Sequence, residues 1–188
     1  MQGDDRGDLG VGRVEAGRVE AGRVGVGKIG VGRVGVGVIG CGTISDVYLK
    51  NLSRSESARV VAVADLDVER AKQKAEQYGV TAAATVGELL ALSGVDLVLN
   101  LTVPNAHADV ALQCLRAGKS VYSEKPLATS FDDGALVLAE AGRRGLRVGC
   151  APDTFLGSGQ RTCRELIAGG AIGTVVGAVA FMANHGME

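Results

Sequence analysis

Short apolar runs alternate with amphipathic segments along most of the 188-residue chain. Each run is rich in small aliphatic residues and is bounded by glycine, proline or charged residues, which is typical of buried strands. Because strands that alternate with helices form parallel sheets covered on both faces, the pattern predicts an α/β fold with a doubly wound parallel sheet. We expect strands over 34–39, 59–64, 80–84, 95–103, 120–124, 146–151 and 174–182.

The segments between these runs place apolar side chains three or four positions apart, as amphipathic helices do. Asp67 and Asn105 are expected to cap two of these helices, and Thr85 and Ser130 each open a capping box. We expect helices over 45–52, 67–78, 85–92, 105–117, 130–144 and 158–168. Ligands of a doubly wound sheet bind at the carboxyl ends of its strands, so candidate site residues are those directly after each strand.

A five-residue repeat rich in glycine runs from Gly12 to Cys41, and fourteen of the 29 glycines lie in residues 1–42. The period matches no known repeat architecture, and so much glycine loses too much chain entropy to fold alone. We therefore expect residues 1–32 to be disordered and dispensable, as a duplicated copy of the first strand or a misassigned start. The alternative is a flexible binding arm. Under either interpretation, residues 33–152 form the main domain.

A glycine-rich turn follows the first strand and precedes a helix, the setting in which a G-x-G-x-x-G-like motif binds a dinucleotide. Gly40 and Gly42 permit a tight turn and close approach of the backbone to a pyrophosphate. Thr43, Ile44 and Ser45 begin the helix, whose free N–H groups attract anions. Ser45 replaces the third glycine of the motif, which is a mild departure. The alternative is an ordinary turn at a helix start.

Asp65 ends the second strand, 25 residues after Gly40, where a dinucleotide-binding motif has an acidic residue after about 20. A carboxylate there can accept hydrogen bonds from both ribose hydroxyls of adenosine and would repel a 2′-phosphate. The sequence therefore predicts that NAD is bound in preference to NADP. The alternative for Asp65 is a capping role at the next helix.

Glu124, Lys125 and Pro126 follow the fifth strand, so the lysine would point into the crevice where a nicotinamide ring would lie. An ammonium in that place can polarise a substrate hydroxyl or carbonyl and take part in proton transfer. On spacing alone, a solvated surface lysine is an equally good interpretation.

Three segments together are specific: GVIGCGTIS (37–45), VVAVADLD (60–67) and the run from TVPNAHADV to SEKPLA (102–128). They resemble the N-terminal Rossmann domain of the Gfo/Idh/MocA family, which includes glucose–fructose oxidoreductase and inositol dehydrogenases. The resemblance implies that Lys125 contacts the reacting substrate hydroxyl and that Glu124 lies beside the nicotinamide. It also implies a cis bond before Pro126.

The same resemblance assigns a cofactor-facing role to the loop after the fourth strand, through Thr102, Pro104, Asn105 and His107. For His107, an ordinary place in the first turn of a helix is an equally good interpretation.

Members of the resembled family continue with a second α/β domain that forms the other wall of the substrate pocket. We therefore expect residues 153–188 to be only the beginning of an incomplete substrate and oligomerisation domain, with a possible homo-oligomer formed through it. No catalytic role is carried over to His185. From these residues alone we expect little turnover.

Charge and cysteine content exclude several other functions. The formal net charge is −1, so no basic excess supports nucleic-acid binding. No apolar run approaches the ~18 residues that span a bilayer, so no membrane partner is expected. The four cysteines form no C-x-x-C pair and there are two histidines, which argues against a metal site and a disulfide framework. A reducing cytoplasm is the expected location.

The sequence thus favours an NAD(P)-dependent oxidoreductase that moves a hydride between nicotinamide and a secondary alcohol of a sugar or polyol. Two alternatives stay open: a module that binds NAD without turnover, and a nonfunctional truncated product.

Overall fold

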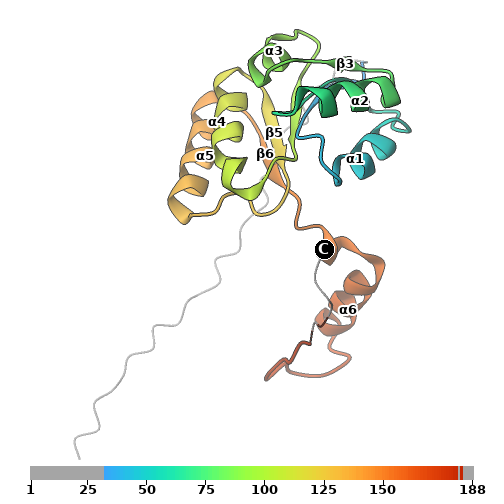
Figure 1. Cartoon of the computed structure of the whole chain (residues 1–188). Helices are drawn as coiled ribbons and strands as arrows, with labels where there is room; N and C mark the ends of the chain where they lie inside the picture. The colour runs from blue at the N-terminus through green and yellow to red at the C-terminus, as the bar shows by residue number, and fades with distance from the viewer. Residues whose placement is uncertain (1–31, 182, 184–188) are drawn as a thin grey trace, which may run out of the picture. The chain divides into compact units, whose positions relative to one another are not determined.

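A six-stranded, wholly parallel sheet forms the centre of the computed structural model, which describes residues 32–181 and 183 (Figure 1). The strand order is β3-β2-β1-β4-β5-β6, so the direction of winding reverses between β1 and β4. The predicted doubly wound Rossmann sheet is confirmed. The strands are β1 (Val34–Ile39), β2 (Ala58–Ala64), β3 (Thr81–Ala82), β4 (Leu97–Asn100), β5 (Ser120–Ser123) and β6 (Val148–Cys150).

Helices cover both faces of this sheet. Apolar side chains of α1 (Ser45–Leu52) and α2 (Val68–Tyr78) pack with one core cluster. Those of α3 (Val86–Ala91), α4 (His107–Arg116) and α5 (Phe131–Arg144) pack with the other. The central strand β1 lies between the two layers, and Val36, Val38 and Ile39 are at most 2% exposed.

Capping residues set most helix starts as the sequence predicted. Asp67 accepts hydrogen bonds from the backbone N–H groups of Glu69 and Arg70 at the start of α2. The hydroxyls of Thr85 and Ser130 likewise accept from backbone N–H groups at the starts of α3 and α5. These side chains satisfy amides that have no partner inside their own helix.

The predicted cap at Asn105 is wrong. A 3-10 turn, η1 (Pro104–Ala106), precedes α4, and Ala106 occupies the cap position without a side-chain hydrogen bond. Pro104 fixes the backbone at the start of this turn, and the N–H of Ala106 donates to the carbonyl of Val103. The turn therefore satisfies the amide groups that a capping side chain would otherwise have to bind.

The predicted strand over 174–182 is also wrong for the part that the structure describes. Residues 174–181 form no strand, and Val176 and Phe181 are almost fully exposed. A strand needs a neighbour for its backbone N–H and C=O groups, and no other described segment pairs with this one. Upstream of it, η2 (Thr154–Leu156) precedes α6 (Ser158–Ala168), which lies within the helix predicted there.

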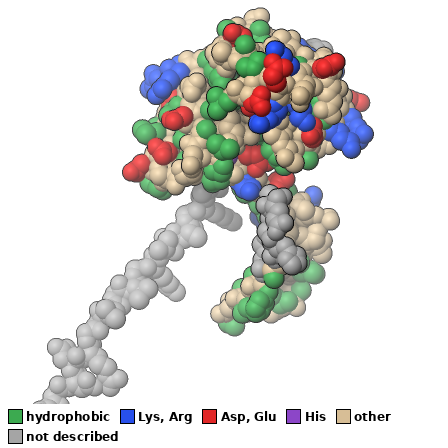
Figure 2. Space-filling view, in the orientation of Figure 1, with side chains coloured by type: hydrophobic (Ala, Val, Ile, Leu, Met, Phe, Trp, Pro, Cys, Tyr) green, Lys and Arg blue, Asp and Glu red, His purple; other side chains and the backbone are tan. Residues whose placement is uncertain are grey.

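Two further expectations concern the two ends of the chain. The expected disorder of residues 1–32 lies, except for Gly32, outside the described residues, and the beginning of a second domain in 153–188 stays a prediction. No helix within residues 32–181 is long and apolar enough to cross a membrane. Acidic and basic side chains are interspersed on the face seen in Figure 2.

Candidate functional site

A groove of about 730 Å³ opens at the carboxyl ends of the strands, beside the point where the strand order reverses. Side chains from α1, from the loop after β4, from the end of β5 and from the segment after β6 form its walls. Six of the predicted site residues line it: Ile44, Thr102, Pro104, His107, Glu124 and Lys125.

The glycine-rich turn directly precedes α1, and of residues 40–45 Ile44 lines the groove. Gly40 has a φ of 98°, and a Cβ atom there would lie 2.5 Å from the carbonyl oxygen of Leu101. Glycine is thus required at Gly40 both for the turn and for close packing against the β4 loop. The hydroxyl of Ser45, which is fully buried, donates to the carbonyl of Gly42 at 2.6 Å and closes the turn.

Three consecutive amides after the turn are free to bind an anion. In the described part of the chain, the N–H groups of Gly42, Thr43 and Ile44 have no hydrogen-bond acceptor. Thr43 and Ile44 are exposed, and a Cβ atom at Gly42 would meet open space. This arrangement at a helix N-terminus fits the pyrophosphate of a dinucleotide.

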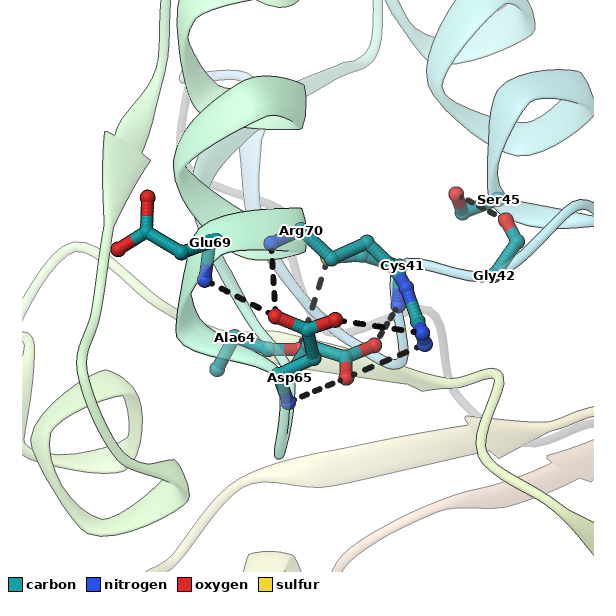
Figure 3. A network of polar contacts seen from close by, with 8 residues as sticks. Cys41, Gly42, Ser45, Ala64, Asp65, Glu69 and Arg70 are labelled. Atoms are coloured by element: carbon teal, nitrogen blue, oxygen red, sulfur yellow. Dashed lines mark hydrogen bonds and ion pairs between the residues drawn. The ribbon is translucent and has the colours of Figure 1, made fainter.

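Asp65 holds the turn to the end of β2 (Figure 3). Its Oδ2 atom accepts a hydrogen bond of 2.7 Å from the N–H of Cys41, and its Oδ1 atom accepts one of 2.8 Å from the N–H of Asp67. The Nη1 atom of Arg70 lies 3.5 Å from Oδ1. The Asp65 side chain is only 10% exposed, so its ribose-binding role stays a prediction, while its contact with the turn is direct.

Cys41 lies within this cluster but is not a nucleophile. Burial, followed by the charge of Asp65, raises the pKa of the Cys41 thiol to about 11. A thiol needs to ionise to attack a substrate, so Cys41 serves as a small apolar side chain in the core.

The segment Glu124–Pro126 follows β5, and Glu124 and Lys125 line the groove. The Oε1 atom of Glu124 accepts a hydrogen bond of 2.7 Å from the hydroxyl of Tyr48, and its Oε2 atom accepts one of 3.0 Å from the N–H of Lys125. The Lys125 side chain is exposed and has no hydrogen-bond or ion-pair partner among the described residues. The bond before Pro126 is cis, as the resemblance implied.

Tyr48 is a groove residue that the sequence analysis did not single out. Its spacing of four residues from Ile44 fits an apolar position of a helix, and nothing in the local sequence marks its hydroxyl as a site group. Burial, followed by the hydrogen bond to Glu124, raises the pKa of Tyr48. The phenol therefore stays protonated and donates to the carboxylate.

The loop after β4 divides into exposed and buried residues. Pro104 and Asn105 are exposed, although Asn105 does not line the groove. Thr102 donates its hydroxyl to the Oδ1 atom of Asn100 at 2.7 Å. The ring of His107 is 1% exposed and lies between two backbone carbonyls rather than in solvent.

The structure therefore brings most of the predicted residues to one edge of the sheet but gives them different surroundings. Gly42, Thr43, Ile44 and Lys125 offer unused donors, whereas Asp65 and His107 are engaged by neighbouring groups. No group of three or more metal-binding side chains occurs within the described residues.

Comparison with known proteins agrees with this geometry. Residues 34–151 match the oxidoreductase family with an NAD-binding Rossmann fold known as GFO_IDH_MocA, and the chain belongs to that family. Inositol 2-dehydrogenase 3 of Saccharopolyspora erythraea is 36% identical over 135 residues, which cover 70% of this chain and 39% of that protein. The 1,5-anhydro-D-fructose reductase of Ensifer adhaerens is 31% identical over 131 residues, which cover 69% of this chain and 39% of that protein.

Among solved structures, KijD10, a 3-ketoreductase from Actinomadura kijaniata in complex with NADP, superposes with a TM-score of 0.70 at 31% identity. That match covers 76% of this chain and 46% of KijD10. The chain thus spans about two-fifths of the length of the curated relatives reported above. The family and the free amides of the glycine-rich turn together support binding of NAD(P).

Proposed function

We propose that the protein is an NAD(P)-dependent oxidoreductase that acts on a secondary alcohol of a sugar or polyol, or on the corresponding ketone. The observation that carries the proposal is the exposed side chain of Lys125, which lines the groove beside Glu124 and has no partner among the described residues. The names of the relatives, an inositol dehydrogenase, an anhydrofructose reductase and a ketoreductase, supply the substrate class.

The residues of this chain would share the work as follows. The amides of Gly42, Thr43 and Ile44 would bind the pyrophosphate, and Asp65 would accept from the adenosine ribose. The bound dinucleotide would supply the hydride donor or acceptor. The Nζ atom of Lys125 would hold the substrate oxygen and exchange its proton: as the neutral amine it would receive the hydroxyl proton in oxidation, and as the ammonium it would donate a proton to the carbonyl oxygen in reduction.

The preference for NAD over NADP belongs to the same proposal. Asp65 places a carboxylate at the end of β2, where it opposes a 2′-phosphate. Arg70 lies beside it with its side chain 49% exposed, so this guanidinium offsets part of the repulsion. We therefore expect the protein to bind NAD more tightly than NADP, by a smaller margin than Asp65 alone would produce.

The cytoplasmic location is also part of the proposal. Cys41, Cys114, Cys150 and Cys163 are all free, and Cys41 and Cys114 are buried. Free thiols of this kind are usual in a reducing compartment.

Binding and turnover are tested separately. Titration of the chain with NADH and NADPH, followed by nicotinamide fluorescence, tests the dinucleotide site. Turnover on a panel of inositols and ketosugars is then followed by nicotinamide absorbance, both with the chain itself and with a fusion to the remaining residues of the S. erythraea relative.

In the active form, Lys125→Ala should lower kcat by about 10²–10⁴-fold, the usual contribution of a positioned acid or base. Lys72→Ala, an exposed lysine of α2 paired with Glu69, is the matched control and should leave kcat unchanged. Dinucleotide binding without turnover in either form would instead assign a non-catalytic binding module.

A further inference from the structure

A histidine is almost completely enclosed directly beneath the Lys125 loop. His107 is the first residue of α4 and is 1% exposed. Its Nδ1 atom lies 2.5 Å from the carbonyl oxygen of Pro126, and its Nε2 atom lies 2.9 Å from that of Thr102. The ring therefore connects the loop after β4 with the loop after β5.

Other buried polar side chains hold the same histidine in place. Asn100, which is fully buried, donates from Nδ2 to the backbone carbonyl of His107 at 2.9 Å and to the hydroxyl of Ser123 at 3.3 Å. Its Oδ1 atom accepts from the hydroxyl of Thr102. The backbone and both ring nitrogens of His107 are thus fixed from β4, β5 and the loops that follow them.

The Lys125 loop has few other attachments. The N–H of Glu124 donates to the carbonyl of Asn100, and the Sγ atom of Cys150 donates to the carbonyl of Glu124 at 3.7 Å. The side chain of Glu124 accepts from the hydroxyl of Tyr48 and from the N–H of Lys125. Pro126 has no N–H, so its carbonyl is its only backbone hydrogen-bonding group. The contact with His107 therefore uses the single polar attachment that the backbone of Pro126 can offer.

We propose that His107 is a positioning residue for Lys125: its ring holds the Pro126 carbonyl and so fixes the backbone that presents the lysine to substrate. This inference rests on the proposed function only in naming Lys125 as the catalytic residue. It differs from a cofactor-contacting role, because a ring with 1% exposure and two engaged nitrogens has little left to offer a ligand.

The proton on the ring decides which contact forms. Both neighbours of His107 are carbonyl oxygens, so a neutral ring donates to one of them and a charged ring donates to both. The contact with Pro126 is the shorter of the two. The inference requires that Nδ1 carries a proton, whether or not Nε2 carries one as well.

Two substitutions separate the two ring contacts. In His107→Asn, the amide nitrogen replaces Nδ1 and can still donate toward Pro126. In His107→Gln, the amide nitrogen replaces Nε2 and can donate toward Thr102 only. Glutamine is closer to histidine in volume than asparagine, so a purely packing role predicts that His107→Gln is the milder change.

The readout is hydrogen exchange of the Glu124 and Lys125 amides in the full chain, measured by NMR with Val38 of β1 as the reference for global stability. We expect exchange at Glu124 and Lys125 to stay near wild type in His107→Asn. In His107→Gln it should become about fivefold faster, the factor expected for one lost hydrogen bond. Equal effects, no effect, or a milder His107→Gln would overturn the proposal.

A second measurement does not depend on whether these variants fold. The sequence contains two histidines, so His185→Gln leaves His107 as the single imidazole. Its nitrogen-15 spectrum should show a proton on Nδ1 at neutral pH, and a ring protonated on Nε2 alone would contradict the inference. Neither measurement uses a dinucleotide, so failure of the proposed function would be seen separately in the NADH titration.

Discussion

The glycine-rich turn and the loops after β4 and β5 are built in different ways. On the glycine-turn side, residues 40–45 and Asp65, backbone amides and one carboxylate hold the turn, with an arginine nearby. On the β4–β5 side, residues 100–107 and 123–126, polar side chains that are at most 1% exposed hold two loops: Asn100, His107 and Ser123. The first side keeps donors free for an anion, whereas the second uses its donors internally and leaves one lysine exposed.

This difference suggests a division of labour. The free amides of Gly42–Ile44 can bind charge without rearranging, because their positions follow from the turn and the helix start. A lysine has a long flexible side chain, and its placement depends on the backbone that carries it. A buried, fully hydrogen-bonded network under that backbone limits its movement.

The largest expected effect is on the glycine-turn side. Gly40→Ala would place a Cβ atom 2.5 Å from the carbonyl of Leu101 at a φ of 98°, so we expect the free energy of unfolding to fall by at least ~2 kcal/mol. Urea denaturation measures this change. Gly42→Ala is the matched control: its Cβ atom meets open space, so stability should stay within ~0.5 kcal/mol while NADH binding weakens. Equal stability losses in the two variants would contradict the structure of the turn.

The next effect concerns the carboxylate between the turn and β2. Asp65→Ser removes the acceptor of the Cys41 amide and the predicted ribose ligand, so NAD affinity should fall by about 10-fold or more. NADP affinity should fall less, because repulsion of the 2′-phosphate is removed with the carboxylate. Isothermal calorimetry with both dinucleotides measures the change in preference.

Asp67→Ser is the control for this experiment, because serine is also a good helix cap and Asp67 contacts α2 rather than the turn. Its dinucleotide affinities should match the wild type. A wild-type chain that binds NADP more tightly than NAD would refute the assigned preference.

The smallest effect is expected at the hydrogen bond between Tyr48 of α1 and Glu124. Tyr48→Phe removes the donor to Glu124 and should lower the free energy of unfolding by about 1 kcal/mol at pH 8. Folding raises the pKa of Tyr48, so its contribution is complete below the unfolded pKa of about 10 and is lost as pH rises through the folded value.

The phenylalanine variant should therefore lose stability less steeply than wild type above pH 10. Denaturation curves across this range provide the measurement. Tyr78→Phe is a comparison variant, since Tyr78 bonds to Asp46 and its pKa is also raised, with burial as the largest cause. It should change the alkaline slope without altering NADH affinity, whereas Tyr48→Phe should alter both.

The same two sides explain how far the sequence could be interpreted. Short apolar runs predicted the strands, and the caps at Asp67, Thr85 and Ser130 predicted helix starts, because these signals lie within a few residues of the elements that they define. The glycine turn followed from the same local order of strand, glycines and helix. The Asn105 cap failed because Pro104 starts a 3-10 turn that competes with it.

The contacts on the β4–β5 side could not be predicted from the sequence, for a physical reason. The contact of Tyr48 with Glu124 joins residues 76 positions apart, and that of His107 with Pro126 joins residues 19 apart. No periodicity within one element encodes such pairs. The same limit applies to the expected strand over 174–182, since apolar spacing describes one strand and says nothing of its neighbour.

Five of the six residues of β1 are buried, and this burial distinguishes the strand from a near copy of it in the sequence. Residues 24–30 read VGVGKIG and residues 34–40 read VGVGVIG. A shift of ten residues keeps the alternation of faces, and the two segments differ only at Lys28 in place of Val38. Val38 is 0% exposed, and an unpaired lysine in that position would lose its hydration in the core. Within these seven positions, a single valine therefore makes the downstream copy the one suited to the centre of the sheet.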